Sequence, residues 1–324
     1  MATSTFEPDQ HPVDDMTKSE LPTTIGVVGG GTMGVGIAYV FARAGWSTTV
    51  VEPDDDRAAA MRITMVEAVR QGVARGKLSA DQADAIPDAV RRVRSVGELD
   101  SDLGLVVETV PERFEVKRVV LVEIEQRRPR VIATNSSALS INELAAVMAR
   151  PASFLGMHFF NPVWSLPMVE IVRGTATTDE TVDRACRIAL AIGKQTITVN
   201  DSPGFATSRL DLIASLEAMR MLEDGVASAV DIDRAMVIAY RHPVGPLRLS
   251  DMVGLDVRLD IARNLAASLG DRYAPPRILV DKVAAGELGQ KSGRGFFTWS
   301  DGVGPAAADT SSPSSPIARP KGSQ

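Results

Sequence analysis

The segment HFFNPVWSLPMVE, residues 158 to 170, places a histidine and a glutamate on either side of an Asn-Pro turn. His158 is one of three histidines in the chain, and Glu170 lies on the apolar segment after the turn. An imidazole transfers protons near neutral pH, and a carboxylate on its other ring nitrogen would fix the tautomer. The pair therefore indicates general acid–base chemistry, with a buried core histidine as the alternative.

The other histidines and the single cysteine favour structural roles. His11 lies in the polar N-terminal segment, and His242, in YRHPVGP, is expected to cap helix carbonyls rather than touch substrate. Cys186 excludes an internal disulfide framework and any cysteine-built metal site. Its surrounding helical pattern predicts a small buried hydrophobic residue rather than a nucleophile. We expect no metal site.

A glycine-rich turn, GVVGGGTMGVG, follows an apolar segment and opens a helical pattern. Gly29 would permit the tight turn, Gly31 would let a pyrophosphate approach the backbone, and Gly34 would let helix and strand pack closely. The helix start at Thr32 and Met33 would then present free N–H groups to the phosphates. A turn that serves packing only is the alternative.

A carboxylate follows at the spacing that a dinucleotide site needs. Glu52, in VVEPDDD, lies 18 residues beyond Gly34 and can accept hydrogen bonds from both hydroxyls of an adenine ribose. It would repel a 2′-phosphate, and the acidic residues 54–56 strengthen the preference for NAD over NADP. The positive charge of Arg57 would instead favour a 2′-phosphate. The alternative to a ribose-binding role for this segment is a solvated acidic loop. With NAD bound, an alcohol substrate needs a base, which favours the catalytic role of His158.

Size and composition exclude several classes of protein. The 324 residues, 44% of them hydrophobic, are ample for a large core and suggest two domains. A net charge of -6 argues against nucleic acid or an anionic membrane as the main partner. No apolar run is long enough to cross a bilayer, and the N-terminus lacks a signal-peptide pattern, so we expect a cytoplasmic protein.

Short segments rich in Val and Ile alternate with helical patterns in the first two thirds of the chain. The expected strands are TIGVVG, STTVVE, LGLVVE, RVIATN, SFLGMHFF, MVEIVR and QTITVN. This alternation predicts an α/β protein with a doubly wound, mostly parallel Rossmann sheet. After DSPGFATS the strands stop, and long amphipathic patterns predict a smaller all-helical C-terminal domain.

These patterns divide the chain into four parts. We expect a disordered arm over 1–20, an NAD-binding Rossmann domain over 21–200, a helical substrate and dimerisation domain over 201–300, and a disordered tail over 301–324. The apolar surface of AMRML and AMVIAY exceeds what one small bundle needs, which predicts a homodimer through the helical domain.

The chain resembles the L-3-hydroxyacyl-CoA dehydrogenase family, including bacterial 3-hydroxybutyryl-CoA dehydrogenases, over about residues 23 to 299. The matching blocks are IGVVGGGTMGVGIA, VVETVPERFEVK, ATNSSALSI, GMHFFNPVWSLPMVEIV, DSPGFATSRL, HPVGPLRLSDMVGLD and GQKSGRGFF. The resemblance implies NAD-dependent interconversion of short (S)-3-hydroxyacyl-CoA and 3-oxoacyl-CoA, as in fatty acid β-oxidation. Two alternatives stay open: a substrate that is carrier-protein-bound or a free hydroxy acid, and a non-catalytic NAD-binding relative.

The resemblance also implies roles for individual residues. It makes His158 the base and Glu170 its partner, and it places Ser137 on the substrate oxygen near the nicotinamide. Glu112 and Lys117 match positions beside the nicotinamide ribose. From the residues alone these two would be surface charges, and the serine loop would be a helix start with a capping-box spacing.

Three further positions are expected at the cofactor. Asn161 matches a residue on the cofactor side of the family's site, Lys291 one that approaches the cofactor, and Asn135 completes the set. From the residues alone, Asn161 would be a turn residue and Lys291 a solvated charge.

The substrate side departs from the family at one position. Ser208 stands in PGFATSRL where the family usually has an asparagine that helps bind substrate. Serine is shorter but keeps a donor and an acceptor, so we expect an altered substrate fit rather than another chemistry. Arg75 and Lys77 are expected to meet the CoA phosphates, with a solvated face as the alternative.

Overall fold

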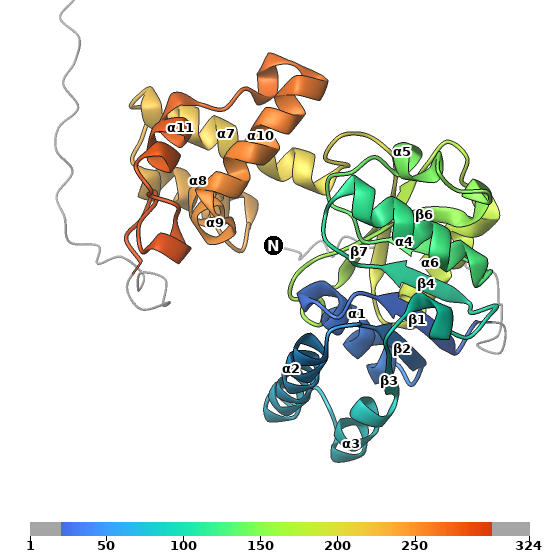
Figure 1. Cartoon of the computed structure of the whole chain (residues 1–324). Coiled ribbons are helices and arrows are strands. Elements are labelled where there is room, and N and C mark those ends of the chain that lie inside the picture. Colours follow the sequence, from blue (N-terminus) through green and yellow to red (C-terminus); the bar gives the residue numbers. More distant parts are fainter. Residues whose placement is uncertain (1–20, 300–324) are drawn as a thin grey trace, which may run out of the picture. The chain divides into compact units, whose positions relative to one another are not determined.

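The computed structural model describes residues 21–299, which form two compact units that divide between Thr207 and Ser208 (Figure 1). The arm and the tail expected from the sequence lie outside the described residues. Among the described helices, none combines the length and apolar character needed to cross a bilayer.

The first unit is an α/β unit on one eight-stranded sheet of order β3-β2-β1-β4-β5-β6-β7-β8. The strands are β1 (Thr24–Val28), β2 (Ser47–Val51), β3 (Val90–Val93), β4 (Leu105–Glu108), β5 (Ile132–Thr134), β6 (Phe154–Phe159), β7 (Met168–Arg173) and β8 (Gln195–Asn200). The helices are α1 (Thr32–Arg43), α2 (Asp55–Ala74), α3 (Ala80–Asp88), α4 (Phe114–Gln126), α5 (Ile141–Ala145) and α6 (Asp179–Ala191), with short 3₁₀ turns at Val96–Glu98 and Pro151–Ser153. Every neighbouring pair is parallel except β6 and β7. The predicted doubly wound, mostly parallel sheet is confirmed.

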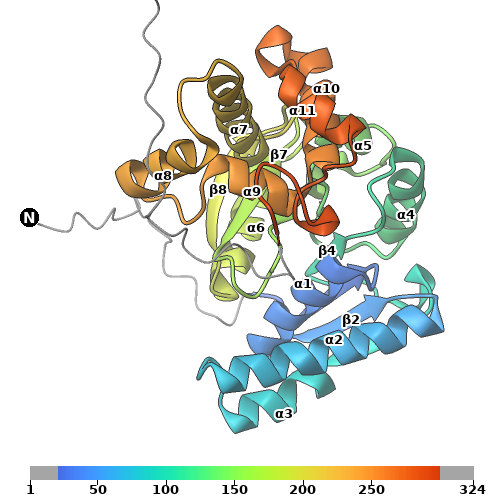
Figure 2. The ribbon, with the colours of Figure 1, turned by 90° about the vertical axis from the view of Figure 1, so that its left-hand side faces the viewer.

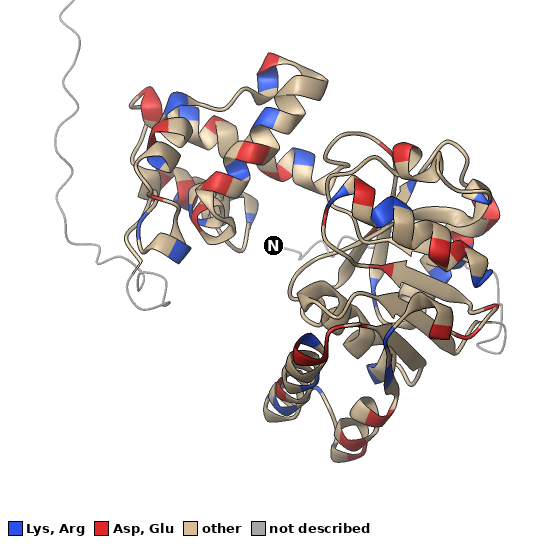
Figure 3. Cartoon of the chain, viewed as in Figure 1, with Lys and Arg blue, Asp and Glu red and all other residues tan. Residues whose placement is uncertain are grey.

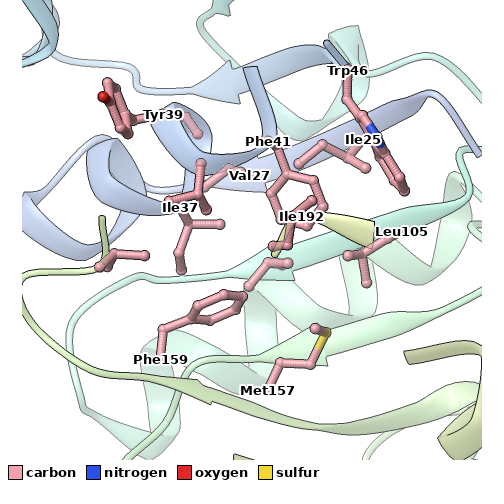
Figure 4. Close-up of a cluster of buried hydrophobic side chains, with 14 of the residues drawn as sticks. Ile25, Val27, Ile37, Tyr39, Phe41, Trp46, Leu105, Met157, Phe159 and Ile192 are labelled. Atoms are coloured by element: carbon pink, nitrogen blue, oxygen red, sulfur yellow. The ribbon is translucent and has the colours of Figure 1, made fainter. Parts of the chain in front are cut away.

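Successive side chains of each central strand enter different cores, as the pleat requires. On β4, Leu105 and Val107 join the core beneath α1, α2 and α6, whereas Val106 joins the core beneath α4 and α5. Figure 4 shows the first of these cores, in which Phe41 and Trp46 pack with their ring centroids 5.4 Å apart. The apolar runs of the central strands are therefore buried on both faces, whereas QTITVN forms the edge strand β8, which has no fully buried residue.

The edge strand β3 was not predicted from the sequence. Its segment, VRRV, is half polar and has one buried residue, Val93, so it lacks the apolar run that marked the other strands. It acquires strand geometry by pairing with β2, in a register that joins Thr48 to Val90. The chain reaches it through α2 and α3, which lie side by side in Figure 2.

The second unit is helical, as predicted. Its helices are α7 (Thr207–Glu223), α8 (Ala229–Tyr240), α9 (Pro246–Val253), α10 (Leu255–Leu269) and α11 (Arg277–Ala284), with 3₁₀ turns at Asp271–Tyr273 and Gln290–Ser292. Leu212, Leu216 and Met219 on α7 pack in one core with Leu247 of α9 and Leu259 of α10. Acidic and basic residues are interspersed along the helices of both units (Figure 3).

The end of α8 departs from expectation in one detail. The backbone N–H of His242 donates to the carbonyl of Met236, 3.2 Å away, while Arg241 adopts a left-handed φ of 61°. The N–H of Arg241 donates to the same carbonyl, and this second bond has the 6→1 span of a Schellman cap. The main chain, rather than the imidazole, therefore closes this helix.

Candidate active site

The glycine turn lies where the strand order reverses, between β1 and β4. Gly29 has φ +114°, a left-handed conformation that favours glycine. A Cβ on Gly34 would lie 1.9 Å from the carbonyl oxygen of Gly29, so only glycine fits there. The hydroxyl of Thr109, at the end of β4, donates to the carbonyls of Val28 and Gly29, both at 3.0 Å. Ligands of doubly wound sheets bind at this kind of switch point.

Gly31 serves a different purpose from Gly34. A Cβ on Gly31 would meet no protein atom within 4 Å, so the protein's own packing does not require glycine there. Gly31 is the N-cap of α1, with Thr32 and Met33 in the first turn, whose N–H groups have no helical acceptor. An open backbone beside a helix N-terminus is a phosphate-binding arrangement, so these residues fit a dinucleotide.

Glu52 lies at the end of β2 and is buried against the turn. Its carboxylate accepts from the N–H of Gly30 at 3.1 Å and of Asp54 at 3.0 Å. Arg57, the residue that argued for a 2′-phosphate, donates to the same carboxylate at 3.2 Å. The guanidinium is thus paired with Glu52, whose contact with a ribose stays a prediction.

A cavity of about 340 Å³ opens at the carboxyl ends of β4, β5 and β6. It brings together seven of the seventeen site residues expected from the sequence, from four separate stretches of the chain. They are Met33, Thr109, Val110, Glu112, Lys117, Asn135, Ser137, His158, Phe159, Phe160 and Asn161.

The one antiparallel strand pair places His158 opposite Glu170. The register of β6 on β7 pairs these two residues directly, so their side chains leave the sheet on the same face. The ring Nδ1 of His158 lies 3.0 Å from Oε2 of Glu170, and both side chains are buried. The contact expected between the two residues is present.

Four donors converge on the Glu170 carboxylate. Besides the histidine, the backbone N–H groups of Ala206 (2.9 Å) and Thr207 (3.1 Å) bond Oε1, and the Thr207 hydroxyl bonds Oε2 at 2.8 Å. Burial alone would raise the pKa of Glu170, but the bonds from His158, Ala206 and Thr207 outweigh it and hold this pKa below its usual value. The group is therefore an anion at the start of α7, a favourable position for negative charge.

The carboxylate determines which ring nitrogen is free. Because ionised Glu170 can only accept, Nδ1 of a neutral His158 carries the hydrogen and Nε2 keeps its lone pair. The rings of Phe160 and Phe205 flank the imidazole, with centroids at 4.4 Å and 6.0 Å. The arrangement can act as a general base through Nε2, on a ring fixed from two sides.

The loop that carries Ser137 is wrapped around Glu112. Oε1 of Glu112 accepts from the hydroxyl of Ser136 and from the backbone N–H groups of Ser137 (2.9 Å) and Ala138 (3.0 Å). Burial would raise the pKa of Glu112, but Lys117 and these donors lower it below its usual value. From the residues alone Glu112 would be a surface charge, and it is exposed, but its carboxylate is bonded by this loop and by Lys117. The loop ends as expected, with Ser140 capping α5.

Lys117 is buried, which corrects its reading as a surface charge. Its side chain is 1% exposed, and its ammonium lies 2.8 Å and 3.0 Å from the two oxygens of Glu108. The carbonyl of Val110 and Oε2 of Glu112 lie 3.2 Å from the same nitrogen. Protein acceptors therefore suffice for all three ammonium hydrogens. Glu108 was not expected from the sequence, although it ends an apolar strand much as Glu52 follows one.

Two asparagines and one lysine order the end of β6. Oδ1 of Asn135 accepts from the N–H of Phe159 at 2.8 Å and so joins the ends of β5 and β6. Asn161 lines the cavity in the segment that follows. Buried Lys194, also missed from the sequence, donates to the carbonyls of Val163 and Leu166 in that segment. Only the fold reveals this contact.

Several expected residues are not brought to this cavity. Arg75 and Lys77 are exposed at the far end of α2, whose 20 residues span about 30 Å from the Glu52 end. Ser208 and Lys291 belong to the second unit, where Ser208 lies in the first turn of α7 and Lys291 pairs with Asp256 at 2.6 Å. Their contacts with substrate or cofactor stay predictions. Cys186 is half-buried against the first core.

Comparison with known families covers nearly the whole described chain. Residues 24–202 match the model of the 3-hydroxyacyl-CoA dehydrogenase NAD binding domain, and residues 204–299 match that of the C-terminal domain of the same family. A 3-hydroxybutyryl-CoA dehydrogenase of Mycobacterium tuberculosis is 40% identical over 280 residues, covering 85% of this chain and 98% of the relative. One from Bradyrhizobium diazoefficiens is 37% identical over 280 residues, covering 85% of this chain and 94% of the relative.

A solved structure shows the same fold. The (S)-3-hydroxybutyryl-CoA dehydrogenase of Ralstonia eutropha has a TM-score of 0.82 and 35% sequence identity, covering 86% of this chain and all of that one.

Proposed function

Since the chain belongs to the 3-hydroxyacyl-CoA dehydrogenase family and is an NAD-dependent oxidoreductase, we propose that it interconverts short (S)-3-hydroxyacyl-CoA and 3-oxoacyl-CoA, with 3-hydroxybutyryl-CoA as the preferred substrate. The relatives named for 3-hydroxybutyryl-CoA support the short chain. The proposal includes the place of such a reaction in β-oxidation.

His158 is the general base in this proposal. NAD, when bound, supplies the acceptor for the hydride that leaves C3 of the substrate. Nε2 of His158 takes the hydroxyl proton as the carbonyl forms, and Glu170 stabilises the resulting imidazolium. In the reverse direction the imidazolium returns the proton to the substrate oxygen. Ser137, whose loop is held by Glu112, donates a hydrogen bond to the same oxygen.

One observation carries the proposal: the 3.0 Å contact between His158 and Glu170 lies beside a cavity that Met33 of the glycine turn also lines. A core histidine would need neither a buried anion on Nδ1 nor access to that cavity. The contact explains why Nε2 is available as a base, and the glycine turn explains which cofactor lies nearby.

The test is a substrate panel followed by NADH absorbance. Acetoacetyl-CoA, longer 3-oxoacyl-CoAs, acetoacetyl carrier protein and free acetoacetate are each supplied with NADH and then with NADPH. We expect the highest kcat/KM with acetoacetyl-CoA and NADH. Faster turnover of a carrier-protein thioester or a free acid would contradict the proposed substrate, and Ser208 would then be the first residue to examine. Binding of NADH without turnover of any substrate would favour a non-catalytic relative.

The proposal also includes a homodimer through the second unit. Leu210, Val226, Ile238 and Tyr240 are each more than 60% exposed there, which is unusual for large apolar side chains on one small helical unit. Sedimentation equilibrium should give twice the chain mass of 34.5 kDa. An Ile238→Glu variant should shift the equilibrium toward the monomer, and a wild-type monomer at all concentrations would contradict this part.

A further inference from the structure

A cluster of three charged groups lies at the wall of the cavity, and its charges do not balance. Glu108 is fully buried at the end of β4, Lys117 is 1% exposed on α4, and Glu112 is 36% exposed on its side chain. One ammonium serves two carboxylates at distances between 2.8 and 3.2 Å. The cluster therefore carries one uncompensated negative charge when both carboxylates are ionised.

The remaining partners of Glu108 are neutral. Its carboxylate accepts from the hydroxyl of Thr134 at 2.6 Å and from the N–H of Val110 at 2.6 Å. These donors stabilise an anion but bring no full positive charge. Burial raises the pKa of Glu108, and Lys117, Thr134 and Val110 offset this rise only in part. Glu108 therefore takes up a proton at a higher pH than an exposed glutamate would.

We propose that Glu108 is a positioning residue that biases the cofactor site toward oxidised NAD, because the single ammonium of Lys117 balances only one of the two carboxylates, Glu108 and Glu112. The inference rests on the proposed function, in which the nicotinamide lies at the cavity that Glu112 and Lys117 line. The oxidised ring is cationic and the reduced ring is neutral. A fixed negative charge below the cavity therefore stabilises the first and leaves the second almost unchanged.

Glu108→Gln tests this directly, because glutamine keeps the shape and most hydrogen bonds but removes the charge. In a medium of effective dielectric constant about 20, removal of one nearby charge can cost on the order of 1.4 kcal/mol, which corresponds to a roughly tenfold change in affinity. The ratio of Kd for NADH to Kd for NAD+, measured by calorimetry on the full chain, should fall about tenfold in this variant. Glu108→Asp keeps the charge and should retain the wild-type ratio even if both affinities decrease.

Glu125→Gln is the matched control. Glu125 lies in the last turn of α4 and, like Glu108, accepts backbone N–H groups, here those of Ala149 (3.0 Å) and Arg150. Its neutralisation should leave the ratio unchanged. If Glu108→Gln does not fold, Glu112→Gln removes the same charge from a half-exposed position and should shift the ratio in the same direction.

The outcomes separate this inference from the proposed function. Equal changes in both affinities, or an unchanged ratio in the charge-removing variant, would overturn the role of Glu108 and leave the dehydrogenase proposal intact. Failure of the wild type to reduce acetoacetyl-CoA would overturn the proposed reaction. The ratio of the two nucleotide affinities would still test the role of Glu108, because it does not depend on turnover. The wild-type ratio should also decline toward acid pH, as protonation neutralises Glu108. Glu112, Lys117 and His158 also line the cavity and are present in both proteins, so the decline should be smaller in Glu108→Gln than in the wild type.

Discussion

Replacing Glu170 with glutamine isolates what the carboxylate does for His158. The two backbone donors at Oε1, from Ala206 and Thr207, require an acceptor, so the glutamine oxygen takes that position. Its NH2 group then faces Nδ1 of His158, which must become an acceptor. The ring hydrogen moves to Nε2, where it blocks the base.

The magnitude follows from two losses. A hydrogen bond between charged groups contributes about 1.5–3 kcal/mol, which the developing imidazolium loses without the carboxylate. The wrong tautomer adds a second penalty, and in the serine protease triad the equivalent exchange lowers kcat about 10⁴-fold. We therefore expect Glu170→Gln to lower kcat by about 10³- to 10⁴-fold, or about 4–5.5 kcal/mol in activation free energy.

The assay is steady-state oxidation of (S)-3-hydroxybutyryl-CoA across pH, with NADH affinity measured by fluorescence. The acid limb of the pH profile should move to lower pH in Glu170→Gln, because the protonated ring has lost its stabilising partner. Thr207→Val, which removes one hydroxyl donor and keeps the carboxylate, should cost less than about tenfold. A kcat within fivefold of the wild type, with an unchanged pH profile, would refute the reasoning and leave Glu170 a packing residue.

Four other substitutions test separate parts of the structure. His158→Gln should lower turnover by orders of magnitude and leave NADH affinity nearly intact; equal turnover would remove His158 from the mechanism. Gly34→Ala should destabilise the protein by about 1–3 kcal/mol and abolish NADH binding, because its Cβ would lie 1.9 Å from the Gly29 carbonyl oxygen. Gly31→Ala should lower NADH affinity and leave stability unchanged. Denaturant unfolding would measure the stability of both glycine variants, and calorimetry would measure their NADH affinity. Burial lowers the pKa of Lys194 to about 8, so the unfolded chain holds a proton that the folded chain lacks between that pH and about 10.5. The unfolding free energy of the wild type should therefore rise by up to about 3 kcal/mol across this window, and that of Lys194→Met should not. An identical pH dependence of unfolding free energy in the two proteins would show that the buried ammonium does not produce the rise.

The sequence determined the elements whose signal is local. Each of the seven apolar segments read as a strand became one. The central strands are buried on both faces and need continuous Val and Ile runs, and the edge strand β8 keeps the same β-branched composition. The glycine turn and the seven family blocks likewise identified the family and NAD, since each depends on residues close together in the chain. The capping serine of α5 was also readable, because an N-cap bonds a residue three positions later.

Pairing between distant segments was decided by the tertiary structure alone. Strand β3 lacks an apolar run and exists because β2 offers it an edge. The antiparallel register that joins His158 to Glu170 depends on how β6 and β7 align, which their composition does not encode. From the residues alone Lys117 would be a surface charge, but in the fold it is buried beside Glu108, nine residues earlier in the chain. The local sequence shows which side chains are available. Packing between elements sets their burial and their charged partners, and these decide which side chain acts as an anion, a base or a counter-ion.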